Sequence, residues 1–297
     1  MNLIDFIVTV FVLVDDFYKD FSKHYRLRKG GFSPKLSDSE VITMEIVGEY
    51  LGFYKDKDIY KYFKHHWSNL FPRMPHRTNF VRQCANLWKV KVKEMFFEYI
   101  SYNQGKWIQI VDSMPIEVCK FVRAKNTKLF KGSANYGKWF GNTFFGYRLH
   151  IKINSFGMIR KYILAPASEH DITYVEPLLE NDKDCWVIGD KGYRSQPLHD
   201  KLWQENHIYF HTSLRRNDKK TSILPKQTIR KLSGIRRLIE TVNGQLEEQF
   251  SIKKTTARDL WHLMNRIIRK ILSHTICVFL NLKLKRDPLN LKGLISC

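Results

Sequence analysis

The sequence lacks the cysteine patterns that cross-link small domains through disulfides or bind zinc. The cysteines are odd in number, and none has the CxxC or CxxH spacing of a zinc site. This pattern predicts reduced thiols and an intracellular protein, and it argues against a disulfide-rich scaffold or a zinc domain. The five cysteines are Cys84, Cys119, Cys185, Cys277 and Cys297.

Long hydrophobic runs are absent as well. The N-terminal stretch FIVTVFVLV covers only residues 6–14, follows Asp5 rather than a basic segment, and precedes Asp15 and Asp16. A membrane span needs about 20 apolar residues, and a signal peptide needs a basic start and a small-residue cleavage site. We therefore expect a buried helix here, and no membrane partner.

Several catalytic motifs are also missing. The sequence has no glycine-rich phosphate loop and no nucleophile elbow of the serine hydrolases. Histidines do not cluster at metal-ligand spacing, and we expect His150, within GYRLHIKI, to be a packed strand residue. These absences argue against P-loop nucleotide hydrolases, serine or cysteine hydrolases and histidine-based metal sites.

Acidic residues are scarce relative to basic ones. The 297 residues contain 50 Lys and Arg but only 29 Asp and Glu, which gives a formal net charge of +21. A folded protein with so strong a positive field usually binds a polyanion, and nucleic acid is the first candidate. The alternatives are a basic protein with solvated lysines or one that binds a membrane surface.

What is present divides the chain into two parts. Residues 1–105 show apolar residues at helical intervals, which predicts an all-α domain. Within it, residues 58–83 suggest a possible helix-turn-helix that places His76, Arg77, Thr78 and Asn79 near DNA. We expect residues 106–297 to form a second domain that includes an apolar last helix, residues 259–282, packed on its core or joining two protomers.

The second part changes to short runs rich in β-branched and aromatic residues, with helical segments between the later ones. The predicted order is β-β-β-α-β-α-β-α, which indicates an α/β fold with a mixed five-stranded sheet and flanking helices. This is the element order of a ribonuclease H-like domain. The five expected strands are KWIQIVD, TFFGYRLHIKIN, MIRKYILAPA, DCWVIGD and IYFHTSL.

Three carboxylates fall where chemistry is expected. Asp112 and Asp190 each end an apolar strand, and Glu240 borders an apolar helical stripe. Arg236, four residues before Glu240, and Asn243, three residues after it, lie near Glu240 on the same helix. Three carboxylates, two at strand ends and one on a helix that packs on the same sheet, can bind a pair of divalent cations, and oxygen ligands favour Mg²⁺ or Mn²⁺. Taken singly, each acid has another explanation, as a turn cap or a solvated charge.

Two other acids fit this arrangement less well. Glu117 falls on the strand face opposite Asp112, and Asp171 in ASEHDIT is well placed as a helix N-cap. His170 and Asp171 remain candidates for lining the same cleft.

Two basic segments flank the three acids. Residues 119–142 carry six Lys or Arg and no acid, interleaved with Phe121, Phe130, Tyr136, Trp139 and Phe140, and residues 215–237 form a second cluster. Cations bind phosphates and aromatic faces stack on bases, so both segments suit DNA. The candidate contacts are Arg77, Arg123, Lys125, Lys128, Lys131, Lys138, Lys191, Arg194, Arg215, Arg216 and Arg236.

These motifs, in their order and spacing, resemble the DDE transposases of bacterial insertion sequences, most closely the insertion-sequence 982 family. The resemblance covers nearly the whole chain and rests on IVDSMPIEVC, FFGYRLHIKIN, APASEHDITYVEPLL, VIGDKGY and RRLIETVNGQLEEQF. It implies a ribonuclease H-like catalytic domain whose triad is Asp112, Asp190 and Glu240, with two Mg²⁺ ions that Mn²⁺ can replace.

The resemblance also implies an activity and a setting. The all-α domain would bind the inverted-repeat ends, and the second domain would cleave DNA strands and join them to target DNA, as a homodimer in the bacterial cytoplasm at the nucleoid. A helical signature of related families is incomplete, because Ser233 stands at its Tyr position and Glu247 at its Lys position. Lys253 and Lys254 are candidate substitutes.

Two alternative functions stay open at this point. One is a ribonuclease H-like nuclease that cuts DNA without strand transfer. The other is a non-catalytic DNA-binding regulator in which the three acids are structural.

Overall fold

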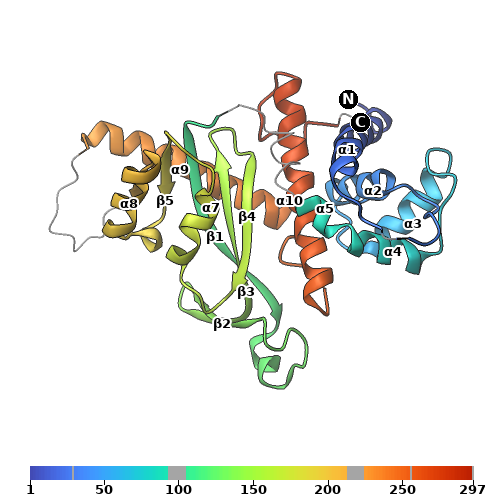
Figure 1. Cartoon of the computed structure of the whole chain (residues 1–297), viewed down its shortest axis with the longest axis horizontal. Coiled ribbons are helices and arrows are strands. Elements are labelled where there is room, and N and C mark those ends of the chain that lie inside the picture. Colours follow the sequence, from blue (N-terminus) through green and yellow to red (C-terminus); the bar gives the residue numbers. More distant parts are fainter. Residues whose placement is uncertain (29, 93–104, 213–223, 255, 296–297) are drawn as a thin grey trace. The chain divides into compact units, whose positions relative to one another are not determined.

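A computed structural model describes residues 1–28, 30–92, 105–212, 224–254 and 256–295. The chain forms two compact units, one of Met1–Ile100 with Leu246–Cys297 and one of Ser101–Gln245 (Figure 1). No helix in these described ranges combines the length and the hydropathy of a membrane span.

The second unit is built on a mixed sheet of six strands (Figure 1). The strand order is β2-β3-β1-β5-β6, and β4 also pairs with β3. The β1/β3, β2/β3 and β3/β4 pairs are antiparallel, whereas the β1/β5 and β5/β6 pairs are parallel. The strands are β1 (Ile108–Cys119), β2 (Asn135–Trp139), β3 (Asn142–Asn154), β4 (Ile159–Pro166), β5 (Trp186–Gly189) and β6 (Tyr209–Thr212).

The mixed α/β sheet expected from the sequence is confirmed and is consistent with a ribonuclease H-like fold, but the expected number of five strands is wrong. The additional strand is β2, which lies within the first basic segment. Its sequence NYGKW is short and has no clear apolar alternation, so the periodicity does not reveal it. Gly137 in β2 packs so closely that a Cβ atom there would lie 2.5 Å from the Ala167 carbonyl oxygen.

Strand β1 is longer than expected. The sequence predicted that it ends at Asp112, but its pairing with β3 continues as far as Cys119. The pairing with β5 covers only Ile108, Gln109 and Ile110, so β5 leaves the rest of β1 unpaired on that side. Such an edge accommodates Pro115, which lacks a backbone N–H.

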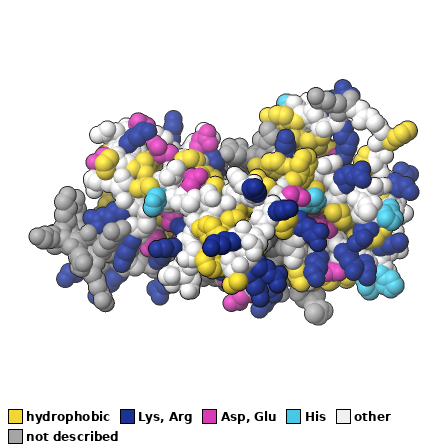
Figure 2. All heavy atoms as spheres, turned by 90° about the horizontal axis from the view of Figure 1, so that it is seen from below, with side chains coloured by type: hydrophobic (Ala, Val, Ile, Leu, Met, Phe, Trp, Pro, Cys, Tyr) yellow, Lys and Arg dark blue, Asp and Glu magenta, His cyan; other side chains and the backbone are white. Residues whose placement is uncertain are grey.

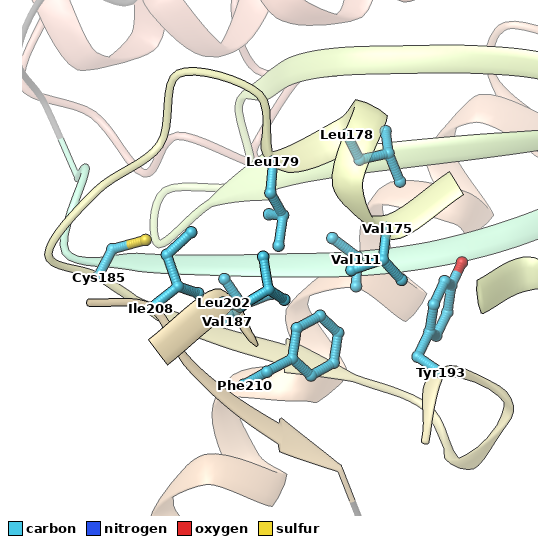
Figure 3. Close-up of a cluster of buried hydrophobic side chains, with 10 residues drawn as sticks. All are labelled: Val111, Val175, Leu178, Leu179, Cys185, Val187, Tyr193, Leu202, Ile208 and Phe210. Atoms are coloured by element: carbon cyan, nitrogen blue, oxygen red, sulfur yellow. The ribbon is translucent and has the colours of Figure 1, made fainter. Parts of the chain in front are cut away.

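Short helices cover the sheet and enclose a core cluster (Figure 3). Val111 from β1 packs there with Val187 from β5 and Phe210 from β6. Gly189 at the end of β5 allows this packing, because a Cβ atom there would lie 2.9 Å from the Phe210 ring. The helices of this unit are η1 (Phe121–Asn126), η2 (Asp171–Tyr174), α7 (Val175–Leu179), η3 (Lys191–Tyr193), α8 (Gln196–Asn206) and most of α9 (Lys226–Glu248).

The first unit is helical. Its second helix begins with a capping box, in which Ser37 Oγ accepts a hydrogen bond from Glu40 N and the Glu40 carboxylate accepts one from Ser37 N. Its helices are α1 (Leu3–His24), α2 (Asp38–Tyr50), α3 (Asp56–His66), α4 (Arg77–Asn86), α5 (Trp88–Val92) and α10 (Leu260–Lys283).

The expected division of the chain is corrected at its C-terminal end. We expected the last helix to belong to the second domain, but α10 packs on α2, α4 and α5 of the first unit. Buried ion pairs hold it there: Arg269 binds Glu49 and Asp56, and Lys270 Nζ lies 2.5 Å from Glu49 Oε2. The apolar pattern of the helix predicted burial, but these polar partners decide against which helices it packs.

The connection between α3 and α4 also differs from the expected motif. It spans ten residues, 67–76, whereas a helix-turn-helix has a turn of three to four residues. Tyr60 of α3 donates a hydrogen bond to the Pro75 carbonyl over 2.8 Å, which fixes this longer connection against the helix.

Candidate active site

Asp112 in β1 and Asp190 directly after β5 occupy equivalent positions along two adjacent parallel strands. The last parallel pair of β1 and β5 is Ile110 with Ile188, and each aspartate follows its isoleucine by two residues. Asp190 directly follows β5, where its carbonyl oxygen accepts a hydrogen bond from Tyr193 N over 3.0 Å, while its carboxylate caps no helix. The turn at Asp190 therefore uses the backbone and leaves the carboxylate available.

The environment of Asp112 disfavours an uncompensated negative charge. Burial raises the pKa of Asp112 to about 6, and the nearby carboxylates of Asp190 and Asp171 act in the same direction. The Ser113 backbone N–H and the Arg236 guanidinium oppose this shift of the Asp112 pKa. A proton or another cation at this position is consequently favoured.

Helix α9, which carries Glu240, contacts both aspartates through Arg236 and Asn243. Arg236 lies 3.7 Å from Asp190 Oδ1 and 3.3 Å from Glu240 Oε1. Asn243, one turn after Glu240, donates a hydrogen bond from Nδ2 to Asp112 Oδ2 over 3.0 Å. The side chains of Asp190 and Glu240 are 51% and 55% exposed, so a substrate can reach both.

The expected apolar stripe explains why α9 presents this face. Ile239, Val242 and Leu246 are fully buried, and Glu240 and Asn243 lie beside them on the same helix. Buried residues at this spacing fix the rotation of the helix.

Asp171 is the centre of a polar cluster that includes Ser113, the residue next to Asp112. Its Oδ1 accepts hydrogen bonds from Arg148 Nη1 at 2.8 Å and from Ser113 Oγ at 3.1 Å. The N-cap expected for Asp171 is wrong, because His170 holds that position in η2 and the Asp171 carboxylate binds across the sheet instead. Asp171 is thus tied to the residue next to Asp112.

Arg148 and Ser113 were not predicted from the sequence. Arg148 lies in β3 among buried residues, and its Nη2 also donates to the Lys138 carbonyl over 3.2 Å. The sequence signal that could have revealed Arg148 is a charged residue inside an otherwise apolar strand, because a buried charge needs a partner.

His150 is a packed strand residue, as expected. It is fully buried, it stacks on Tyr174 with ring centroids 4.8 Å apart, and its Nδ1 lies 3.4 Å from the Tyr193 hydroxyl. Burial lowers the pKa of His150 to about 4, so the imidazole is neutral at pH 7.

The residues fit a divalent cation in part. The donors are carboxylate oxygens, and Asn243 Oδ1 beside Asp112 is buried with no hydrogen-bond partner among the described residues. No three His, Cys, Asp or Glu side chains in the described ranges are grouped closely enough to hold one ion. Instead, the Arg236 guanidinium supplies the positive charge between Asp190 and Glu240.

The predicted DNA contacts of the first basic segment are exposed. They lie on η1, on β2 and on the loop between them, and Lys and Arg side chains outnumber Asp and Glu on the face drawn in Figure 2. Among the aromatic residues, Phe140 is 90% exposed, whereas Phe130 is buried against Tyr147 and is unavailable for stacking. The exposed basic residues are Arg123, Lys125, Lys128, Lys131 and Lys138.

The other predicted contacts are more varied. Lys191 is exposed beside Asp190, and Arg194 is partly buried. Arg77 is exposed at the start of α4 in the first unit. Arg215 and Arg216 lie outside the described residues, and Arg236 is engaged with two carboxylates.

Lys253, one of the two candidate substitutes for the missing signature lysine, lies next to Glu247, which occupies that position. Lys253 Nζ is 2.6 Å from Glu247 Oε1, and Glu247 stands where related families carry a lysine. The positive charge is thus present near that position, although it is paired with an acid.

Comparison with known proteins is consistent with this site. A family model described as a transposase DDE domain matches residues 102–260, which is more than half of the chain and includes all three predicted triad residues. No curated protein and no solved structure matches the chain. The chain belongs to the DDE transposases.

Proposed function

We propose that the chain binds the inverted-repeat ends of an insertion sequence, cleaves DNA at these ends and joins the strands to target DNA, with Asp112, Asp190 and Glu240 as the catalytic carboxylates. The carrying observation is the equivalent placement of Asp112 in β1 and Asp190 directly after β5, with Glu240 linked to Asp190 through Arg236. Binding as a homodimer and membership of the insertion-sequence 982 family are parts of the same proposal.

The three carboxylates would hold two Mg²⁺ ions, for which Mn²⁺ can substitute. Such a pair of ions supplies an activated water or 3′-hydroxyl and stabilises the leaving oxygen at a phosphodiester. Asp112 suits this role because its buried carboxylate lies near other negative charges. Asn243 orients Asp112, and Arg236 balances the charge of Asp190 and Glu240 when no metal is bound.

Double-stranded DNA is the proposed partner of the basic segments. The exposed lysines of η1, β2 and the intervening loop would contact phosphates near Asp112, and the helices of the first unit would bind the ends. Each neutralised phosphate releases counterions, so binding should weaken steeply as salt rises.

Substitution of each carboxylate tests the proposal. Asp112→Asn, Asp190→Asn and Glu240→Gln should abolish cleavage and joining of labelled end DNA while end binding is retained. Glu117→Gln is the matched control, because Glu117 is an exposed carboxylate on the same strand as Asp112. Full activity of any one triad variant with Mg²⁺ present removes that residue from the triad.

A strand-transfer assay with a pre-cleaved end separates transposition from simple cutting. Joined product is expected. Cleavage without any joined product indicates a nuclease of the same fold, and binding without cleavage indicates a non-catalytic regulator.

A further inference from the structure

The first unit carries two neighbouring hollows on the exposed side of α4. The larger has a volume of about 650 Å³ and lies between α4 and residues 27, 28 and 32–35, and the second, of about 590 Å³, lies between α4 and residues 259–262. Arg82, Asn86 and Trp261 line both hollows. Volumes of 300 to 1,000 Å³ are typical of sites for small ligands, so a nucleotide can enter either one.

The larger hollow is positively charged. Among the described residues, no Asp or Glu lines it, whereas Lys35, Arg82 and Lys89 do. Arg28 also lines it, but its guanidinium is neutralised by Asp38. The lining therefore attracts an anion such as a phosphate.

Aromatic faces are presented beside these cations. Trp261 donates a hydrogen bond from Nε1 to the Ala85 carbonyl over 2.6 Å, and the residue is 49% exposed. The bond fixes one edge of the indole and holds its orientation. Phe32, which also lines the larger hollow, is fully exposed. An indole that is held in place and open to solvent is a stacking surface for a base.

The surroundings of α4 favour an unpaired nucleotide over a duplex groove. A recognition helix must protrude to enter the major groove. Here the exposed face of α4 is flanked by residues 27, 28 and 32–35 and by residues 259–262. A single base with its phosphate can reach Asn86 and Arg82 between these flanks.

We propose that the larger hollow binds unpaired nucleotides of DNA, with a base stacked on Trp261 and its phosphate on Arg82 and Lys89. This inference rests on the proposed function only in taking DNA as the partner. It adds a site for single-stranded DNA, 3′ or 5′ overhangs included, on the helical unit.

Fluorescence anisotropy with the full chain tests the site. The probes are a blunt duplex, the same duplex with an overhang of five nucleotides, and a single strand of random sequence. The overhang should bind about tenfold more tightly than the blunt duplex, since stacking of one base is worth roughly 1–3 kcal/mol. Equal binding of the blunt and overhang probes overturns the inference.

Two variants locate the effect. Trp261→Ala should remove the overhang preference, and Arg82→Gln should weaken overhang binding and reduce its salt dependence by about one phosphate contact. Trp203→Ala is the control, because Trp203 is 55% exposed on α8 of the other unit. Thermal unfolding of each variant checks the fold, and Arg82→Gln carries the test if Trp261→Ala unfolds.

Other outcomes are equally decisive. If both variants keep the overhang preference, the inference is overturned. If Trp261→Ala changes the oligomeric state in sedimentation but not DNA binding, the surface is a contact between protomers. If the wild-type chain cleaves and joins DNA but shows no preference for the overhang, only this binding site is rejected. If the chain binds no DNA, the proposed function is rejected as well.

Discussion

Asn243 on α9 donates a hydrogen bond to Asp112 on β1 over 3.0 Å, across 131 residues of sequence. This bond ties the helix that carries Glu240 to the strand that carries Asp112, so Asn243 is a positioning residue. Partners of this kind typically contribute 10- to 100-fold to the affinity or activity of a metal site.

Asn243→Ala should therefore lower single-turnover cleavage of end DNA by about 10- to 100-fold with little change in DNA binding. Asn243→Asp should be at least as damaging, because it sets a second negative charge against Asp112. Thr241→Ala on the exposed side of α9 is the control. Wild-type cleavage by both Asn243 variants, at saturating DNA and Mg²⁺, contradicts a positioning role.

The Arg148–Asp171 pair should be coupled to the site through Ser113. Both side chains are mostly buried, at 13% and 18% exposure, and Asp171 also binds the Ser113 hydroxyl. A double-mutant cycle of Arg148→Met and Asp171→Asn, followed by denaturant unfolding, should give a coupling energy of about 0.5–3 kcal/mol. The exposed pair Lys201 and Glu176 is the control and should show no measurable coupling.

Cleavage gives a second measure of the same pair. Asp171→Asn should reduce the cleavage rate, because the neutral amide oxygen is a weaker acceptor than the carboxylate for Ser113 and Arg148 next to Asp112. A variant that is destabilised but cleaves at the wild-type rate shows that the pair serves the fold alone.

The sequence predicted the elements that local patterns specify. The apolar stripe of α9 predicted the margin on which Glu240 lies, and the apolar run before Asp190 predicted the strand that ends there. Both are properties of neighbouring residues, so a single sequence contains them.

Features that depend on distant partners were not predicted. The end of β1 was misplaced because Asp112 interrupts its apolar run, although β3 continues to pair beyond it. Strand β2 lacks alternation, and it exists because β3 supplies its hydrogen bonds. The partners of Asp171 and of α10 lie far away in the sequence, where periodicity carries no information.

The buried ion pairs of α10 predict a strong effect on stability. Arg269 is fully buried and binds Glu49, Asp56 and the Tyr54 carbonyl, so its removal leaves two buried carboxylates without this partner. Arg269→Met should lower the free energy of unfolding by about 3–5 kcal/mol.

The exposed pair of Lys253 and Glu247 is the matched comparison, because its side chains are 43% and 38% exposed. Lys253→Met should cost no more than about 1 kcal/mol in urea unfolding. Equal effects of Arg269→Met and Lys253→Met would show that burial does not set the strength of these contacts.

His274 should make the helical unit sensitive to mild acid. It is fully buried on α10 against the Phe250 ring, and burial lowers its pKa to about 3. The unfolded chain binds a proton at His274 near pH 6.5, whereas the folded chain resists protonation down to about pH 3. The stability due to neutral His274 is therefore present above pH 6.5 and is lost progressively as the pH falls from 6.5 toward 3.

His274→Gln tests this origin, because glutamine is of similar size and does not titrate. Between pH 6.5 and 4 the free energy of unfolding of the wild type should fall more steeply than that of the variant, by up to about 1.4 kcal/mol per pH unit. Urea unfolding at several pH values, followed by a probe of the helical unit, measures the difference. His150 in the other unit has a lowered pKa of its own and stays in both proteins, so it cannot produce the difference. Identical pH dependence in the two proteins assigns the acid sensitivity to other groups, such as Asp56, whose lowered pKa acts only below about pH 4.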